Sequence, residues 1–472
     1  MYRFDPNSLS RWSDGKWTDS PSNGINGFTI DSRKVSSGDM FVAIKADRDG
    51  HDFLDQATNE GAVAGLVDHH VGSTQVPQLV VGDTLLSFQR IAKQHRAQFS
   101  GKVVGVTGSC GKTSTKEILK TILNQSLCTE GNLNNFLGVP LTLTQVCEGE
   151  HRFAVVEAGI NQMGEMDVLT DMICPNLTII TSIDHSHLEG LQTIENVANE
   201  KIRLWTHSAE KCLGVFPEEL LQYESFKKAI SEERPHILIK KGGLQEEVQD
   251  PNQVLYNIST ETNEGGHSNV LNIERFECPP LCIPIEPLSE GLIRNMVLAC
   301  VAAWKLGASD EEIFERLPQY CPSGLRGSNL VGRGRSYLVD CYNANPASMK
   351  DSIQYFSRKF RNKPKLLVLG GMNELGTMSQ KLHFETGKSI VMDETDRAIL
   401  IGGHARQMAQ GMIDSGARVD QLVVLENAED GRPLIEEFDG PVLLKGSRSF
   451  RLEELVPKWA VEEDSQQLGM LC

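Results

Sequence analysis

The sequence has no apolar run long enough to cross a bilayer, and the N-terminal residues MYRFDPNSLSRWSDG lack the apolar segment of a secretory signal. The eleven cysteines are scattered singly apart from Cys278 and Cys282, so neither a disulfide framework nor a four-ligand zinc site is expected. No stripe of Lys and Arg offsets the formal charge of −17, which argues against nucleic acid as a partner. These absences favour a soluble, cytoplasmic protein with reduced thiols and no membrane insertion.

The chain has 472 residues, more than one hydrophobic core normally supports, so several α/β domains are expected. Short apolar runs followed by a helical pattern at 84–99 predict a smaller N-terminal α/β domain over residues 1–99. Strands that alternate with helices predict a central doubly wound parallel sheet over 100–321. Five apolar runs predict a second, Rossmann-like parallel sheet over 322–472. Residues 210–269 carry no recognisable chemistry, and the tail after Val461 is expected to fray.

The stretch from Lys102 to Leu123, KVVGVTGSCGKTSTKEILKTIL, predicts a strand, a glycine loop and a helix. Glycines allow backbone N–H groups to converge, and Lys112 and Thr113 at a helix N-terminus suit a nucleotide triphosphate and its Mg²⁺. The spacing is GxxGKT, because Val106 stands where the first glycine of the longer GxxxxGK motif belongs. An ordinary strand-to-helix turn is the alternative, and the flanking elements favour phosphate binding.

Polar side chains follow two further strands of the predicted central sheet. Glu157 ends the run FAVV, whereas Asp184, His185 and His187 follow LTIITS. Parallel sheets place ligands at the carboxyl ends of their strands, so these groups are suited to complete a Mg²⁺ site or to polarise a substrate. Ordinary surface residues are the alternative.

The outer parts of the chain also concentrate polar residues between apolar runs. Residues 30–53 include Ser32, Arg33 and Lys45, which suit a phosphorylated sugar nucleotide, although a solvated loop fits the composition equally well. In the C-terminal part, the tips DCYNANPASM (340–349) and KGSRS (445–449) follow strands and are suited to face a ligand. Each tip by itself is also compatible with a simple turn.

Several segments form a combination in a fixed order, namely GVTGSCGKT, TEGNLNNFLGVPLTL, VVEAG, HLEGL with a lysine soon after, DCYNANPASM, GGMNELG and LLKGSRS. Together they resemble the Mur ligase family over nearly the whole chain. YNANPASM, NELG and KGSRS are most similar to the branch of that family that adds D-alanyl-D-alanine, and DSRKVSSGDMFVAIK is similar to the UDP-binding segment of that branch.

The resemblance implies three domains that bind, in order, the UDP end of a substrate, ATP and an amino component. It implies a monomeric, ATP- and Mg²⁺-dependent amide ligase that joins D-Ala-D-Ala to UDP-MurNAc-tripeptide through an acyl phosphate. This reaction is the last cytoplasmic step in assembling the peptidoglycan precursor peptide. The diamino acid at the third position of the tripeptide is left open.

The resemblance also implies roles for individual residues. Those expected to contact the nucleotide are Gly108, Ser109, Gly111, Lys112, Thr113, Ser114, Asn295, Arg326 and Asp340. Those expected to hold Mg²⁺ are Thr113, Glu157, His187 and Lys201. Those expected to contact the substrates are Ser32, Arg33, Lys45, Asn134, Asn135, Asn343, Asn345, Lys445 and Arg448. The catalytic set is Lys112, Glu157, His187, Lys201, Arg326 and Asp340.

Lys201 matches a lysine that is carbamylated in many members of the family. A carbamate supplies the anionic oxygens that Mg²⁺ prefers, whereas a free ammonium would be repelled. Helical spacing places Lys201 at the edge of an apolar face, so a solvated lysine is the alternative. Contacts of Arg326 and Asp340 with ATP would also require the C-terminal domain to close, with a hinge at residues 322–327.

Some positions differ from the family pattern. Gly291 and Leu292 stand where the family has a His-Asn pair, Gly371 stands where an aspartate is usual, and Ala46 replaces a glycine. Two alternatives therefore stay open, a related amide ligase of the diamino-acid-adding or folylpolyglutamate type and a nucleotide-binding homologue without catalysis. The segment YNANPASM argues against the first, and the retained catalytic set argues against the second.

Overall fold

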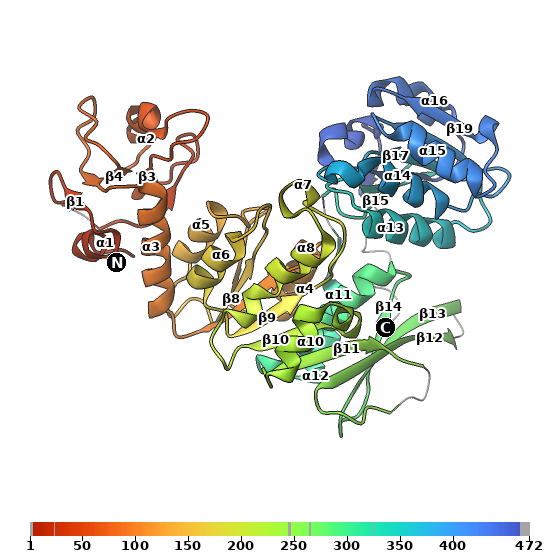
Figure 1. Cartoon of the computed structure of the whole chain (residues 1–472), viewed down its shortest axis with the longest axis horizontal. Helices are drawn as coiled ribbons and strands as arrows, with labels where there is room; N and C mark the ends of the chain where they lie inside the picture. Colours follow the sequence, from red (N-terminus) through yellow and green to blue (C-terminus); the bar gives the residue numbers. More distant parts are fainter. Residues whose placement is uncertain (1–2, 23, 244–246, 264–265, 323, 463–472) are drawn as a thin grey trace.

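The computed structural model describes residues 3–22, 24–243, 247–263, 266–322 and 324–462, and the tail expected to fray lies largely outside them. Within this part of the chain, three separate sheets follow one another along the sequence, with helices packed around each (Figure 1). The α/β prediction is confirmed. Among the helices of the described residues, none combines the length and apolarity needed to cross a membrane.

The N-terminal sheet has the strand order β1-β5-β4-β3-β2 in the described residues, and β2 to β5 are parallel. Its strands are β1 (Lys16–Trp17), β2 (Gly27–Thr29), β3 (Asp39–Val42), β4 (Ala64–Val67) and β5 (Gln78–Val80). Its helices are α1 (Pro6–Ser13), η1 (Gly50–Phe53), α2 (Leu54–Asn59) and α3 (Thr84–Gln98). The Asp83 side chain caps α3 by accepting a hydrogen bond from the Leu86 N–H. At the other end of α3, Arg96 donates to the carbonyls of Ile173 and Cys174, which ties the helix to the C-terminal end of α6 (Glu165–Ile173) in the central part.

The central sheet has the order β14-β13-β12-β11-β10-β9-β6-β8-β7 among the described residues. Its strands are β6 (Lys102–Thr107), β7 (Ser126–Cys128), β8 (Phe153–Glu157), β9 (Leu177–Ile180), β10 (Leu213–Pro217), β11 (His236–Lys241), β12 (Gln253–Asn263), β13 (Gly266–Arg275) and β14 (Leu281–Ile285). Strands β6 to β12 are parallel to one another. Strand β13 runs antiparallel to both of its neighbours, β12 and β14. Residues 210–269, left unassigned from the sequence, therefore extend this sheet.

The helices of the central part are α4 (Lys112–Ile122), α5 (Gly138–Thr144), α6 (Glu165–Ile173), α7 (Leu188–Leu191), α8 (Ile194–Lys201), α9 (Arg203–Thr206), α10 (Glu224–Ser231), α11 (Glu290–Lys305) and α12 (Asp310–Arg316). Val103 of β6 packs into the hydrophobic core on one face of the sheet, and Val104 and Val106 pack into the core on the other. Burial on both faces explains why β6 reads as a continuous apolar run. Because β6 lies between β8 and β9, the chain leaves it at a topological switch point, where such sheets bind ligands.

The C-terminal sheet has the order β19-β18-β17-β20-β16-β15-β21 in the described residues. Its strands are β15 (Ser328–Gly332), β16 (Arg335–Asp340), β17 (Leu366–Gly370), β18 (Arg397–Ile401), β19 (Leu422–Leu425), β20 (Val442–Lys445) and β21 (Val461–Glu462). Its α-helices are α13 (Pro346–Lys359), α14 (Ser379–Lys388), α15 (Ala405–Asp414) and α16 (Arg432–Glu437). The five strands predicted from the apolar runs are confirmed and run parallel. Strands β15 and β21, which the apolar runs did not predict, add antiparallel pairs at the edge beyond β16.

Candidate active site

The loop between β6 and α4 has the backbone geometry of an anion-binding turn. Gly108 and Gly111 adopt φ values of 148° and 83°, which residues with a Cβ rarely do. A Cβ at Gly108 would clash with the Thr181 hydroxyl, and one at Gly111 would lie 2.5 Å from the Asn295 Oδ1. No side chain among the described residues caps the N-terminus of α4 at Gly111. The first N–H groups of α4 are thus open to an anion.

Residues after β9 hold this loop in place. The Ser109 N–H donates to the Ser182 carbonyl at 2.8 Å, and the Cys110 N–H donates to the Ser182 hydroxyl at 3.0 Å. The Ser109 hydroxyl donates to the Asp184 carbonyl at 3.0 Å. The loop after β6 is therefore hydrogen-bonded to the segment after β9, which is one of the two strand ends predicted to bear ligands.

Lys112 is half-buried and folds back over the loop, where its Nζ donates to the Gly108 carbonyl at 2.7 Å. Burial lowers the pKa of Lys112, and the Glu157 carboxylate opposes that shift. The Thr113 hydroxyl donates to the Glu157 Oε2 at 2.9 Å, and the Asn134 amide donates to its Oε1 at 2.8 Å. Two of the predicted Mg²⁺ ligands, Thr113 and Glu157, are therefore hydrogen-bonded to one another, and Asn134 joins them.

Lys116, which the sequence analysis did not single out, is a second cation of this cluster. Its side chain is fully buried, and its Nζ donates to the Thr129 carbonyl at 2.6 Å and lies 3.9 Å from the Glu157 Oε2. Lys116 stands one helical turn after Lys112, so helical spacing alone places both lysines on one side of α4. That spacing was the available signal, but only packing shows that Lys116 is buried beside Glu157.

His187 contacts a residue of the C-terminal part. Its Nδ1 lies 2.5 Å from the Glu374 Oε2, and Glu374 belongs to the NELG segment. Burial lowers the pKa of His187, whereas the neighbouring His187 ring lowers the pKa of Glu374. A neutral imidazole whose protonated Nδ1 faces a carboxylate has the lone pair of Nε2 available as a ligand. Glu374 is thus a candidate site residue that the sequence analysis did not name.

Lys201, at the end of α8, is fully buried, and its Nζ has no hydrogen-bond partner among the described residues. Burial holds the pKa of Lys201 well below its usual value, and the charge of Lys112 adds to this effect. The side chain also interacts electrostatically with Glu157 and His187. The alternative of a solvated lysine is therefore wrong.

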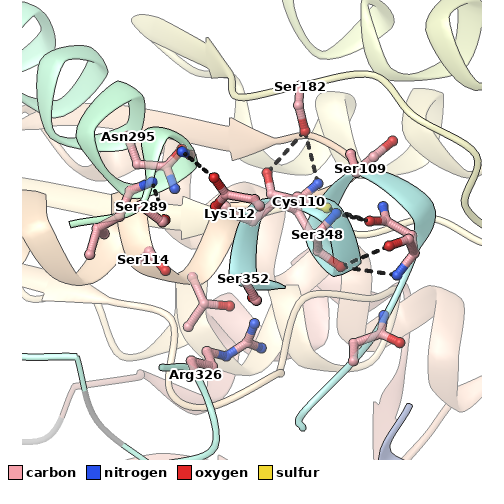
Figure 2. A pocket seen from close by; sticks show the side chains of 18 of the residues that line it. Ser109, Cys110, Lys112, Ser114, Ser182, Ser289, Asn295, Arg326, Ser348 and Ser352 are labelled. Atoms are coloured by element: carbon pink, nitrogen blue, oxygen red, sulfur yellow. Dashed lines mark hydrogen bonds between the residues drawn. The ribbon is translucent and has the colours of Figure 1, made fainter. Parts of the chain in front are cut away.

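These groups surround a cavity of about 790 Å³ that lies between the central and C-terminal parts (Figure 2). The predicted site residues that line it are Ser109, Gly111, Lys112, Thr113, Ser114, Asn134, Asn135, Glu157, His187, Asn295, Arg326, Asp340, Asn343, Asn345 and Lys445. In Figure 2, Lys112 and Asn295 of the central part lie across from Arg326 and Ser352 of the C-terminal part. A cavity of this size and polarity suits a nucleotide together with the reacting end of a substrate.

The C-terminal wall of the cavity is ordered by its own contacts. Lys445 is buried, and its Nζ lies 3.0 Å from the Asp340 Oδ2 and donates to the Asn343 carbonyl at 2.8 Å. The Arg326 guanidinium lies 3.8 Å from the centre of the Tyr342 ring. Two cations of this wall, Lys445 and Arg326, are therefore held in place by neighbouring residues of the C-terminal part.

The N-terminus of α13 joins the C-terminal wall to the phosphate loop. Asn345 caps α13 by accepting from the Ser348 N–H at 2.9 Å, and its Oδ1 also accepts from the Cys110 thiol at 3.0 Å. The Asp184 carboxylate accepts from the Ala347 N–H at 2.8 Å. The amide oxygen of Asn345, predicted to contact a substrate, is therefore already engaged in this structure.

One departure from the family pattern has a structural explanation at the same interface. The Gly291 N–H donates to the Asp351 Oδ1 at 3.1 Å, and a Cβ at Gly291 would lie 2.6 Å from the Asp351 Oδ2. Asp351 of α13 thus occupies the space that a side chain at residue 291 would need. The wall of the cavity at this end of α11 is built from α13 instead.

Apart from Lys201, five of the predicted site residues do not line the cavity. The Gly108 carbonyl accepts a hydrogen bond from the Lys112 Nζ, and the exposed Arg448 pairs with Glu453. The other three are in the N-terminal part, where Ser32 donates to Gln56 at 3.0 Å, Arg33 pairs with Asp31 at 2.9 Å and Lys45 pairs with Asp68 at 2.6 Å. The structure therefore brings together most of the residues predicted for ATP and the acyl transfer, but not Arg448, and the residues predicted for UDP lie outside the cavity.

Comparisons with known proteins agree with this organisation. Three family models match the chain: the Mur ligase family, catalytic domain over residues 24–94, the Mur ligase middle domain over 106–303, and the Mur ligase, glutamate ligase domain over 328–448. The UDP-N-acetylmuramoyl-tripeptide–D-alanyl-D-alanine ligase of Bacillus subtilis is 31% identical over 446 residues, with 92% of each chain covered.

Solved structures of related proteins agree with these sequence matches. MurF from Acinetobacter baumannii superposes with a TM-score of 0.83 at 26% identity, covering 96% of this chain and 97% of that one. The MurF ligase from Thermotoga maritima in complex with ADP gives a TM-score of 0.75 at 25% identity, covering 91% and 96% of the two chains.

Proposed function

Because the chain belongs to the Mur ligase family, we propose that it is an ATP-dependent amide ligase that joins D-alanyl-D-alanine to UDP-N-acetylmuramoyl-tripeptide. One observation carries the proposal: Lys112 and Glu157 of the central part share a cavity with Asp340 and Lys445 of the C-terminal part. A nucleotide bound on the phosphate loop would thus lie opposite the cationic wall of the C-terminal sheet. Both partners of an acyl transfer would then meet in one enclosed space.

We assign the UDP end of the substrate to residues 1–99, ATP to 100–321 and the incoming dipeptide to 322–472. The division is supported by the three sheets, whose strands lie within 16–80, 102–285 and 328–462. Ser32, Arg33 and Lys45 are assigned to the UDP-linked substrate. The enzyme acts as a monomer in the cytoplasm, where ATP and nucleotide-linked sugars are available.

The reaction has two steps. The terminal carboxylate of the tripeptide attacks the γ-phosphorus of ATP, the bond from that phosphorus to ADP breaks, and an acyl phosphate forms. The neutral dipeptide amine then adds to the acyl carbon, the nitrogen of the tetrahedral intermediate loses a proton to solvent, and the C–O bond to phosphate breaks to give the amide and free phosphate. Each step brings anions together, so catalysis depends on positioned cations and exclusion of water.

The residues around the cavity provide these functions. Lys112 leaves the Gly108 carbonyl to neutralise the β- and γ-phosphates, and the open N–H groups of α4 hold the phosphate oxygens. Asn134 and Asn135 orient the substrate carboxylate beside Glu157. Lys445, fixed by Asp340, faces the acyl phosphate from the opposite wall.

The donor set fits Mg²⁺. Thr113 and Glu157 offer a hydroxyl and a carboxylate, His187 offers its Nε2, and the unpartnered Nζ of Lys201 leaves a buried polar atom that a bound ligand would satisfy. When bound, Mg²⁺ would neutralise phosphate charge. Lys116 remains in place as the fixed counter-charge of Glu157.

We also propose that Lys201 carries a carbamate. The neutral amine attacks the carbon of CO₂, an N–C bond forms, one C=O π bond becomes the oxyanion, and the nitrogen loses a proton to solvent. The low pKa and complete burial of Lys201 support this step, because the amine must be neutral to attack. The carbamate would also replace an unpaired amine by an anion close to Lys112.

¹³C-bicarbonate supplied to the protein should yield a carbamate carbon resonance that is absent from Lys201→Ala. Lys211→Ala, which changes an exposed lysine, is the matched control and should keep the signal. If the resonance is missing from the wild-type protein and Lys201→Ala is fully active, Lys201 has no role in binding the metal.

Phosphate release from ATP, measured with UDP-MurNAc-tripeptide in the presence and absence of D-Ala-D-Ala, tests the proposed reaction. Release that requires both substrates supports it. Release with a single amino acid as acceptor would instead indicate a related amide ligase. No release with any acceptor would indicate a homologue without catalysis.

A further inference from the structure

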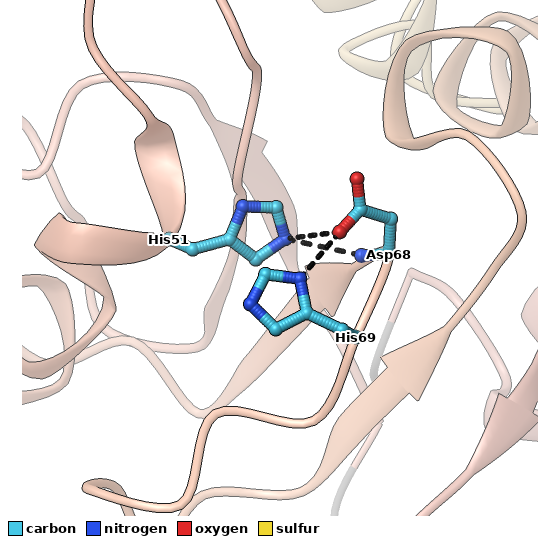
Figure 3. A group of neighbouring side chains, drawn as sticks. All are labelled: His51, Asp68 and His69. Carbon is cyan, nitrogen blue, oxygen red and sulfur yellow. Dashed lines mark hydrogen bonds and ion pairs between the residues drawn. The ribbon is translucent and has the colours of Figure 1, made fainter.

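A cluster of potential metal ligands lies in the N-terminal part, away from the cavity described above (Figure 3). His51 belongs to η1, and Asp68 and His69 follow β4 directly. The Asp68 Oδ1 lies 3.3 Å from the His51 Nε2 and 2.6 Å from the His69 Nδ1. One ligand atom from each residue lies within 4.8 Å of the other two, which is close enough for a single ion to reach all three.

His51 is held in the orientation that a metal ligand requires. Its side chain is buried, and its Nδ1 lies 2.5 Å from the Asp49 Oδ1, which also accepts from the His51 N–H at 3.0 Å. A proton on Nδ1 leaves the lone pair of Nε2 directed at Asp68, where it accepts the Asp68 N–H at 3.1 Å. A carboxylate that orients the far nitrogen of a histidine is the usual support of a metal-bound imidazole.

The other two groups leave an approach to the cluster. Lys45 pairs with the Asp68 Oδ2 at 2.6 Å, so the Oδ1 of Asp68 is the oxygen that faces the imidazoles. The His69 side chain is 57% exposed and stacks on His51 with 4.4 Å between ring centres. Water can therefore reach the cluster from the side of His69 and complete the coordination of an ion.

We propose that His51, Asp68 and His69 bind a divalent cation of the zinc class. Two imidazoles and one carboxylate favour Zn²⁺, Co²⁺ or Ni²⁺ over Mg²⁺, which prefers an all-oxygen shell. Binding would replace the His69–Asp68 hydrogen bond and the Asp68 N–H contact to His51 by metal–ligand bonds. The ion would thereby cross-link η1 to the end of β4. The site lies outside the cavity of the proposed ligase reaction, and it adjoins that function only through Lys45, which pairs with Asp68 and is assigned to the UDP-linked substrate.

Titration of the intact protein with Co²⁺ in excess Mg²⁺ tests the site, because Mg²⁺ occupies oxygen-donor sites and competes poorly for imidazoles. The wild-type protein should show a saturable visible absorption band at one equivalent that Zn²⁺ abolishes. His69→Ala should weaken binding at least about tenfold, and Asp49→Asn should weaken it by about 10- to 100-fold, as expected for the partner of a metal-bound histidine. His70→Ala, which changes the exposed neighbouring histidine, is the matched control and should bind as the wild type does.

Because His69 is exposed, His69→Ala should fold even where a change at the buried His51 does not. Saturating Zn²⁺ should raise the Tm of the wild-type protein and of His70→Ala more than that of His69→Ala. No saturable band in the wild-type protein, or equal affinity in His69→Ala, would overturn the proposal. A thiolate-to-cobalt band in the near ultraviolet as the sole signal would place the ion on cysteine and overturn it as well.

Discussion

Replacement of Lys112 by alanine removes the cation of the phosphate loop that we assign to the β- and γ-phosphates of ATP. At a separation of about 4 Å and an effective dielectric constant of about 20, one charge pair contributes about 4 kcal/mol. Lys112 is only half-buried and gives up a hydrogen bond to the Gly108 carbonyl when it turns to phosphate, so part of that energy is offset. We therefore expect kcat/KM for ATP to fall by about 10²- to 10³-fold, the range measured when one preorganised donor is removed.

Steady-state phosphate release at saturating UDP-MurNAc-tripeptide and D-Ala-D-Ala measures this loss. Lys120→Ala, an exposed lysine in the last turn of the same helix, is the matched control and should stay close to the wild-type rate. The two variants should unfold at similar temperatures, since neither side chain belongs to the core. A Lys112→Ala enzyme within about threefold of wild type would refute the reasoning, because a charge worth less than about 1 kcal/mol is not holding the transferred phosphate.

Three further predictions follow from the same geometry. Lys116→Met should lower the free energy of unfolding, measured in urea, by about 3–5 kcal/mol, because it leaves Glu157 buried beside one cation fewer. Lys120→Met is the control, and equal stability of the two variants would contradict this prediction. Burial lowers the pKa of His187 from its usual 6.5, so the stabilisation from its neutral form is complete above that value and is lost as the pH falls through the lowered pKa. The acid limb of kcat/KM should accordingly lie below pH 6.5, and a limb above it would count against neutral His187 as a ligand. Small-angle scattering should show compaction when an ATP analogue and the UDP-linked substrate bind, and an unchanged radius of gyration would argue against closure about residues 322–327.

The pattern of apolar residues was sufficient to locate the elements that carry the site. Strand β6, the loop after it and helix α4 could be predicted because a buried parallel strand, a glycine turn and an amphipathic helix each leave a local signature. The same holds for the five parallel strands of the C-terminal sheet. Strands β12, β13 and β15 were not assigned from the sequence because they mix polar and apolar residues and lie toward the edges of their sheets, so their pairing is decided by neighbours rather than by local sequence.

Residues close together in the chain were enough to predict the strands and helices, the phosphate loop and the order of motifs that resembles the Mur ligase family. The burial of Lys116 and Lys201, the contact of His187 with Glu374 and the position of Asp351 beside Gly291 could be found only from the packed structure. These facts join residues far apart in the sequence. Burial and partner choice depend on how the sheets and helices pack, and it is packing that removes water from a lysine and makes a distant carboxylate its neighbour.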